Sequence, residues 1–137
     1  PSADDELDVL FDRKDVDPMD AVEPVASGDD VRELQARVRQ VTVSRDVARY
    51  MLAVVHATRE HPDLALGVSP RGSLSMFRAC QSRALLQGRD WVGPDDVQAL
   101  ARPVLAHRLM LGADARYGGK SVEAILDEVL DRTELPT

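Results

Sequence analysis

The sequence predicts an all-α fold, in which a helical bundle follows a short acidic helix and a connector. Apolar residues recur every three or four positions in almost every segment, which is the spacing of a helix with one buried face. No run of alternating apolar and polar residues is long enough to predict a strand. A chain of 137 residues is also long enough to bury one hydrophobic core.

Residues 1–43 are expected to precede the bundle. A short acidic helix at the start ends before Pro18, and residues 15–28, with two prolines and a glycine, are predicted to form a connector. Asp30 and Glu33 have the spacing of a capping box that begins a second helix. The apolar side of the first helix contains Leu7, Leu10 and Phe11, and that of the second contains Val31, Leu34, Val38 and Val41.

Residues 44–137 are predicted to form the bundle, and its first two helices begin at serine caps. Ser44 caps a helix that ends before Pro62. Ser69 followed by Pro70 is an N-cap and first-turn pair, and it begins a helix that stops at Gly88. Both helices have the one-sided apolar spacing that predicts packing against a shared core.

The third helix of the bundle contains a proline. Gly93 and Pro94 begin this helix, with proline in the first turn and acidic residues beside the positive end of the helix dipole. Pro103 is expected to divide the segment, because a helix interior tolerates proline poorly. The sequence therefore predicts two consecutive helices at an angle, over residues 94–101 and 103–110.

The segment before the last helix imitates a nucleotide-binding motif. Gly119, Lys120 and Ser121 match the end of a P-loop, but Asp114 stands where a P-loop needs its first glycine. Residues 112–119 are therefore predicted to be a loop. Ser121 is predicted to cap a last amphipathic helix.

The formal net charge of −7 is unevenly distributed. Residues 1–30 carry eleven Asp or Glu against two basic residues, whereas residues 31–137 carry a small excess of Arg and Lys. An acidic chain with five aromatic residues lacks the basic surface and the stacking platform of a nucleic-acid-binding protein. No apolar stretch is long enough to predict a membrane span. The single cysteine, Cys80, and the acidic N-terminus favour a cytoplasmic location.

Patterns typical of enzymes have little support. The three histidines lack the spacing of a zinc site, and one cysteine cannot form a thiolate cluster. Cys80 falls inside a predicted helix, where a small buried thiol is more common than a nucleophile. The serines lack a nucleophile elbow. The chain alone is therefore expected not to be an enzyme, and no catalytic residue or metal ligand is assigned in it.

Arg71 is the residue whose position indicates a ligand. It falls in the first turn of the helix that Ser69 caps, where its charge faces the positive end of the helix dipole at a cost of ~0.3–1 kcal/mol. A bound anion would relieve this cost, and free backbone N–H groups beside a guanidinium form a natural phosphate site. The local pattern leaves a second interpretation open, in which Arg71 pairs with a nearby carboxylate or extends into solvent.

Four segments of the chain carry a family resemblance: ATREHP (57–62), GVSPRGS (67–73), GRDWVGPDDV (88–97) and PVLAHRL (103–109). In this order they resemble the C-terminal helical lid of the MoxR family of AAA+ ATPases. Residues 2–41 are similar to the end of that family's nucleotide-binding core and its connector. The resemblance therefore covers nearly the whole chain.

The resemblance implies roles for three residues. Arg71 matches the sensor 2 arginine, which reaches from the lid to the phosphates of ATP bound in the core. Ser69 would cap the helix at the phosphate end. Arg59 matches a family position, and two roles are possible for it: a contact at a subunit interface, or a cation that is favourable at the C-terminus of its helix. ATP and Mg²⁺ are expected only with the missing core, because the chain lacks a P-loop, the magnesium-binding acidic strand, sensor 1 and an arginine finger.

The resemblance also implies a function and partners. The chain would be the lid of a chaperone-like remodeller that couples ATP hydrolysis to lid motion and to assembly of a ring, commonly a hexamer. The expected partners are the ATPase core of the same protein, neighbouring subunits and proteins with von Willebrand factor A domains. The alternative is a freestanding helical adaptor whose acidic N-terminal arm binds a basic partner, and a complete gene of about this length would favour it.

Overall fold

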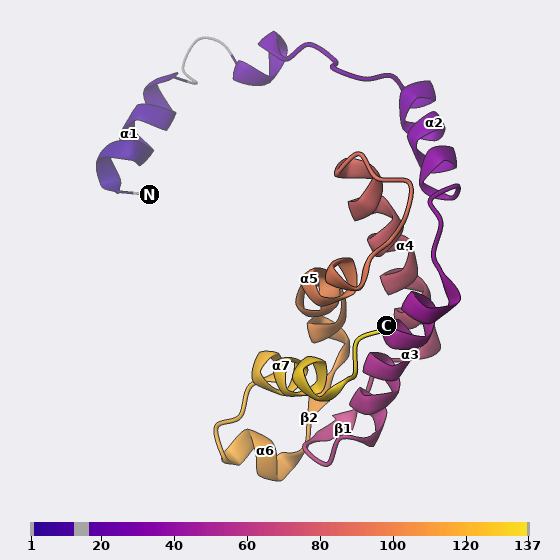
Figure 1. The fold of residues 1–137 in the computed structure, drawn as a ribbon. Helices are drawn as coiled ribbons and strands as arrows, with labels where there is room; N and C mark the ends of the chain where they lie inside the picture. The colour runs from indigo at the N-terminus through magenta and orange to yellow at the C-terminus, as the bar shows by residue number, and fades with distance from the viewer. Residues whose placement is uncertain (1, 13–16, 137) are drawn as a thin grey trace. The chain divides into compact units, whose positions relative to one another are not determined.

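A computed structural model describes residues 2–12 and 17–136 of the chain. Helices make up most of these residues (Figure 1), so the predicted all-α class is confirmed. The chain divides into two compact units, one ending at Glu33 and the other beginning at Leu34. The hydrophobic core lies entirely in the second unit.

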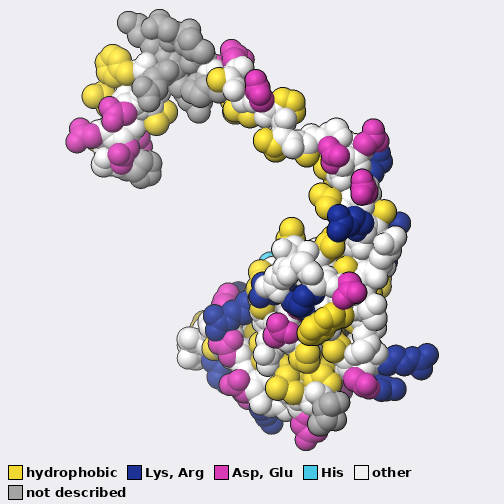
Figure 2. Space-filling view, turned by 45° about the horizontal axis from the view of Figure 1, so that its top comes forward, with side chains coloured by type: hydrophobic (Ala, Val, Ile, Leu, Met, Phe, Trp, Pro, Cys, Tyr) yellow, Lys and Arg dark blue, Asp and Glu magenta, His cyan; other side chains and the backbone are white. Residues whose placement is uncertain are grey.

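The N-terminal unit contains helices whose described side chains are exposed. Helix α1 (Ala3–Asp12) is the short acidic helix that the sequence predicts. Its apolar side chains lie beside its acidic ones on the surface (Figure 2), with exposed fractions of 53% for Leu7 and 72% for Leu10. The predicted connector contains a short 3-10 helix, η1 (Pro18–Ala21), while its residues 15 and 16 lie outside the described residues.

Helix α2 (Gly28–Val38) begins with a capping box, but not the predicted one. The N–H of Ser27 donates to Oδ2 of Asp30 at 2.7 Å, and the N–H of Asp30 donates to Oγ of Ser27 at 3.1 Å. Asp30 is therefore the second partner of the box rather than the cap, and the prediction of an Asp30–Glu33 box is wrong by one turn. The hydrogen bonds from Ser27 lower the pKa of the Asp30 carboxyl.

The second unit is built on four long helices, α3 (Arg45–Glu60), α4 (Pro70–Leu86), α5 (Pro94–Leu105) and α7 (Val122–Arg132). Helix α3 packs against the other three, and α5 also contacts α4 and α7. The largest apolar side chains that are fully buried between them are Met76, Leu105, Leu126, Val54, Val55, Val68 and Val97. Burying apolar area of this kind is the main source of the bundle's stability.

The predicted ends of these helices are confirmed where a local signal sets them. Oγ of Ser44 accepts a hydrogen bond from the N–H of Val47 at 3.1 Å, and Oγ of Ser121 accepts one from the N–H of Ala124 at 3.1 Å. Gly88 follows α4 with a φ of +74°, a left-handed conformation that favours glycine and ends the helix.

The prediction that Pro103 divides its segment into two helices is wrong. Helix α5 continues through Pro103 to Leu105 and is followed by a 3-10 turn, η2 (Ala106–Arg108). Pro103 is exposed and lies in the last turn, so the missing N–H removes one bond near the helix end. Continuing the helix also buries Ala101 and Leu105 completely. This burial outweighs the cost of the proline.

A pair of short strands and one short helix are absent from the sequence prediction. Strands β1 (Leu64–Leu66) and β2 (Met110–Leu111) form an antiparallel pair, and the N–H of Gly112 donates to the carbonyl of Asp63 at 2.8 Å beside them. Strands of three and two residues are too short to show alternation. Helix α6 (Ala113–Tyr117) occupies the segment predicted as a loop, and its Ala115 is buried.

A buried ion cluster holds the loop between α4 and α5. The carboxylate of Asp96 is fully buried and accepts from Nη2 of Arg89 at 2.7 Å, from Nη1 of Arg89 at 2.9 Å and from the N–H of Gly93 at 2.9 Å. Nε of Arg83 lies 3.2 Å from the same carboxylate. Burial acts to raise the pKa of Asp96, but the bonds from Arg89 and Gly93 outweigh it and hold the pKa below its usual value.

Candidate functional site

The N-terminus of α4 is the candidate site. Ser69 is the N-cap, as predicted, with Pro70 in the first turn. The hydroxyl of Ser69 makes no capping bond, and the N–H of Gly72 instead donates to the Ser69 carbonyl at 2.8 Å. Ser69 is exposed, so its hydroxyl is accessible at the helix start. The predicted position is confirmed, while the expected side-chain cap is not formed.

Arg71 is exposed at this helix start. Within the described residues its guanidinium has no hydrogen-bond or ion-pair partner. No acidic residue stands in the first turn of α4, whereas the first turns of α3, α5 and α7 contain Asp46, Asp95 and Asp96, and Glu123 respectively. Helix α3 also begins with a cation, Arg45, but Asp46 lies beside it. Among the four long helices described in the bundle, α4 is therefore the only one whose first turn contains a cation and no acidic residue, so an anion would be favourable there.

Arg59 lies in the last turn of α3. Its Nε donates to the carbonyl of Val68 at 2.6 Å, one residue before Ser69. The structure thus brings Arg59 to the loop that leads into the predicted site, rather than placing it only as a charge at the end of α3. The sequence does not reveal this contact, because it joins residues nine positions apart across a strand and a turn.

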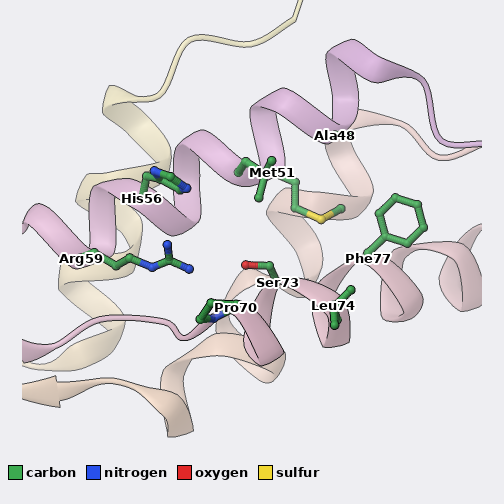
Figure 3. A pocket seen from close by; sticks show the side chains of 9 residues that line it. Ala48, Met51, His56, Arg59, Pro70, Ser73, Leu74 and Phe77 are labelled. Atoms are coloured by element: carbon green, nitrogen blue, oxygen red, sulfur yellow. The ribbon is translucent and has the colours of Figure 1, made fainter.

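A groove of about 540 Å³ runs between α3 and α4 beside the candidate site. Figure 3 shows Arg59 pointing toward Pro70 and Ser73 at one end of the groove, and Met51 beside Phe77 farther along. The lining residues are Ala48, Met51, Leu52, His56, Arg59, Pro70, Ser73, Leu74 and Phe77. Sequence analysis missed the groove, although two leucines outside the buried stripes of α3 and α4 are a signal for it: Leu52 and Leu74.

Two further side chains, Cys80 and Arg108, have structural roles. Cys80 is fully buried, and burial raises the pKa of its thiol to about 12, as expected for an unreactive core thiol. Arg108 packs against α4 and α5, with Nε donating to the Val104 carbonyl at 3.0 Å and Nη2 donating to Ser75 Oγ at 3.3 Å. Within residues 2–12 and 17–136, no group of three or more His, Cys, Asp or Glu side chains is arranged to hold a metal ion. None of the described helices combines the length and the apolar character that crossing a membrane requires.

Known proteins similar to this chain share the region that contains the site. The family model described as AAA lid domain matches residues 56–129. Protein YeaC of Bacillus subtilis is 41% identical over 136 residues, which cover 99% of this chain and 42% of YeaC. Chaperone MoxR1 of Mycobacterium tuberculosis is 36% identical over 145 residues, which cover 99% of this chain and 38% of MoxR1.

A solved structure is similar in fold. The crystal structure of a candidate ATPase from Cytophaga hutchinsonii matches 99% of this chain with a TM-score of 0.84 and 25% sequence identity. The match covers 44% of that protein. The chain thus spans less than half the length of each of these three proteins.

Proposed function

The chain belongs to the AAA lid domain family, as its resemblance to MoxR lids predicted, and we propose that it is the lid of a MoxR-like AAA+ ATPase in which Arg71 contacts the phosphates of bound ATP. The observation that carries the proposal is the guanidinium at the positive end of α4, which is exposed and has no partner among the described residues. A cation in this position lowers helix stability unless an anion is present. The ATPase core of the same protein would supply that anion as nucleotide.

The residues present fit a phosphate group. Arg71 presents a planar fork of N–H donors, which matches the oxygens of a phosphate. The accessible Ser69 hydroxyl lies at the same helix start and can donate a further hydrogen bond. ATP would supply the negative charge and the reaction itself, while the P-loop and the ligands of Mg²⁺ belong to the part of the ATPase outside this chain.

Arg71 is well placed to move the bundle. It is mounted on α4, whose side chains Met76, Cys80 and Ala84 are buried in the core. A force on the guanidinium is therefore transmitted to a packed helix rather than absorbed by a loop. Because ATP and ADP differ in the γ-phosphate that Arg71 would contact, the two nucleotides stabilise different lid positions.

The same proposal extends to partners. A lid that moves with nucleotide can act on the core of a neighbouring subunit, so we expect ring assembly, commonly a hexamer, and proteins with von Willebrand factor A domains as further partners. The resemblance to MoxR lids supports this extension. The mass of the full-length protein with and without ATP tests it, since a monomer under both conditions contradicts ring assembly.

Substitution of Arg71 tests the site. In the full-length ATPase, Arg71→Ala is expected to lower the rate of ATP hydrolysis about 10- to 100-fold, because a hydrogen bond to a charged group contributes ~1.5–3 kcal/mol. Arg71→Lys keeps the charge but loses the fork, so its rate should lie between the two. Arg49→Ala is the matched control, since Arg49 is another exposed arginine, and Asp46 is its only ion-pair partner among the described residues. Normal hydrolysis by Arg71→Ala contradicts the proposal.

A further inference from the structure

Val68 is a loop residue whose two backbone polar groups are held by consecutive residues of α3. Its N–H donates to Oγ1 of Thr58 at 3.1 Å, and its carbonyl accepts from Nε of Arg59 at 2.6 Å. Loop peptides in proteins more often bond to water or to their own turn. Both the N–H and the carbonyl of Val68 are instead hydrogen-bonded to side chains in the last turn of a neighbouring helix, α3.

The Thr58 hydroxyl is committed to this contact. Thr58 is fully buried, and Oγ1 donates to the carbonyl of Val55 at 2.6 Å while it accepts from Val68. Both its donor and its acceptor capacity therefore have partners inside the protein. Loss of the hydroxyl would leave the N–H of Val68 buried without a partner, which is strongly unfavourable.

Close packing on both sides of Val68 extends the contact into α4. A Cβ on Gly67 would lie 2.6 Å from Cα of Arg59, so only glycine allows the loop to approach α3 this closely. A Cβ on Gly72 would overlap Cγ1 of Val68. The backbone of Val68 is thus fastened to α3 while its buried side chain packs against the first turn of α4, directly beside Arg71.

We propose that Thr58 and Arg59 are positioning residues for Arg71, because they hold Val68 and thereby set where α4 begins. The inference rests on the proposed function of Arg71. It adds that a rigid loop, held by Thr58 and Arg59, fixes the position of the Arg71 guanidinium. A contact maintained within a fraction of an ångström matters here, since small displacements of a charged donor reduce its interaction with a ligand. Neither residue needs to touch the nucleotide.

A matched pair at Thr58 tests this role in the full-length ATPase. Thr58→Val keeps the shape but removes the hydroxyl, and it is expected to lower kcat about tenfold, since it breaks one buried hydrogen bond. Thr58→Ser keeps the hydroxyl and should retain most of the activity. Thr133→Val is the control, because Thr133 also bonds a helix carbonyl, that of Val129, but has no link to α4. Equal activity of Thr58→Val and the wild type overturns the proposal.

Combination with Arg71→Ala separates positioning from general stability and from direct binding. If Thr58 acts through Arg71, Thr58→Val should cause no further loss of kcat in an Arg71→Ala background. Arg59→Met, which keeps the aliphatic stem but removes Nε, should behave in the same way. Losses that multiply in the double variants overturn the positioning role, because they show that the residue acts independently of Arg71.

Hydrogen exchange tests the positioning contact without relying on hydrolysis. In the full-length protein, Thr58→Val is expected to raise the exchange rates of the Val68, Gly72 and Ser73 amides at least about tenfold over Thr58→Ser, while Ile125 in α7 stays unchanged. Unchanged exchange at Gly72 and Ser73 overturns the inference. If Arg71→Ala leaves hydrolysis normal, the proposed function fails, and exchange at these amides still decides whether Thr58 sets the start of α4.

Discussion

Two helices of the bundle both begin with a proline in the first turn, but the charged residues beside that proline have opposite signs. Helices α4 and α5 both have proline in the first turn, after Ser69 and Gly93 respectively. At the start of α5, Asp96 is fully buried and every strong partner it needs lies within the chain. At the start of α4, Arg71 is exposed and unpartnered within the described residues.

The difference separates a structural helix start from a functional one. An anion at the positive end of a helix is favourable, and the buried cluster around Asp96 uses that preference to hold the loop between α4 and α5. The cation at the start of α4 opposes the same preference. A site that is locally unfavourable when empty gains the most from binding an anion.

The largest expected effect is on stability at the start of α5. Asp96→Ala leaves Arg89 without its buried partner and should lower the free energy of unfolding by about 3–5 kcal/mol, whereas Arg71→Ala removes an unfavourable cation and should leave it unchanged or raise it by up to about 1 kcal/mol. Urea unfolding of both variants measures the contrast. Similar losses in the two variants would show that Arg71 has a structural role, and would contradict the difference between the starts of α4 and α5.

A smaller effect is expected where the loop approaches α3. Gly67→Ala places a Cβ 2.6 Å from the backbone of Arg59, and overpacking of this kind costs about 1–3 kcal/mol. Gly28→Ala is the matched control, because a Cβ there meets only the end of the flexible Arg32 side chain at 3.7 Å. Thermal unfolding should separate the two variants. An unchanged melting temperature for Gly67→Ala would show that the start of α4 is not held rigidly.

The pH dependence of stability should reflect Asp96. Its folded pKa is lowered, so its contribution is fully present above the unfolded pKa of 3.8 and is lost as the pH falls through the lower folded value. The effect is smaller than deletion, because a protonated carboxyl still forms hydrogen bonds. Urea unfolding between about pH 6 and pH 2 measures it. The acid-induced loss should be reduced in Asp96→Asn, and an identical loss in both proteins would contradict this assignment.

The smallest expected effect on stability comes from reversing the charge at the start of α4, which is the direct test of its difference from the start of α5. Arg71→Glu puts an acidic residue at the positive end of α4 and should raise the free energy of unfolding by about 0.3–1 kcal/mol. The same change should abolish the nucleotide response of the full-length ATPase, because the carboxylate repels phosphate. A variant that is more stable but inactive would show that Arg71 is kept for function, whereas a less stable variant would contradict the dipole argument.

Local signals explain which parts of the fold could be predicted. Ser44 and Ser121 cap their helices through hydrogen bonds that span three residues, so the sequence alone contains the information. The Asp30–Glu33 box was wrong because Ser27 competes for the same carboxylate. Pro103 misled the prediction because the burial of Ala101 and Leu105, which depends on other helices, outweighs the local cost of proline.

At the candidate site, too, local sequence determines some features and tertiary contacts determine the others. The sequence by itself determined that Arg71 stands in the first turn of a helix after Ser69 and Pro70, because helix starts depend on neighbouring residues. Only the tertiary structure decided that Arg71 has no partner among the described residues and that Val68 is held by Thr58 and Arg59. Those facts depend on contacts between segments about ten residues or more apart, and packing of the whole bundle sets such contacts.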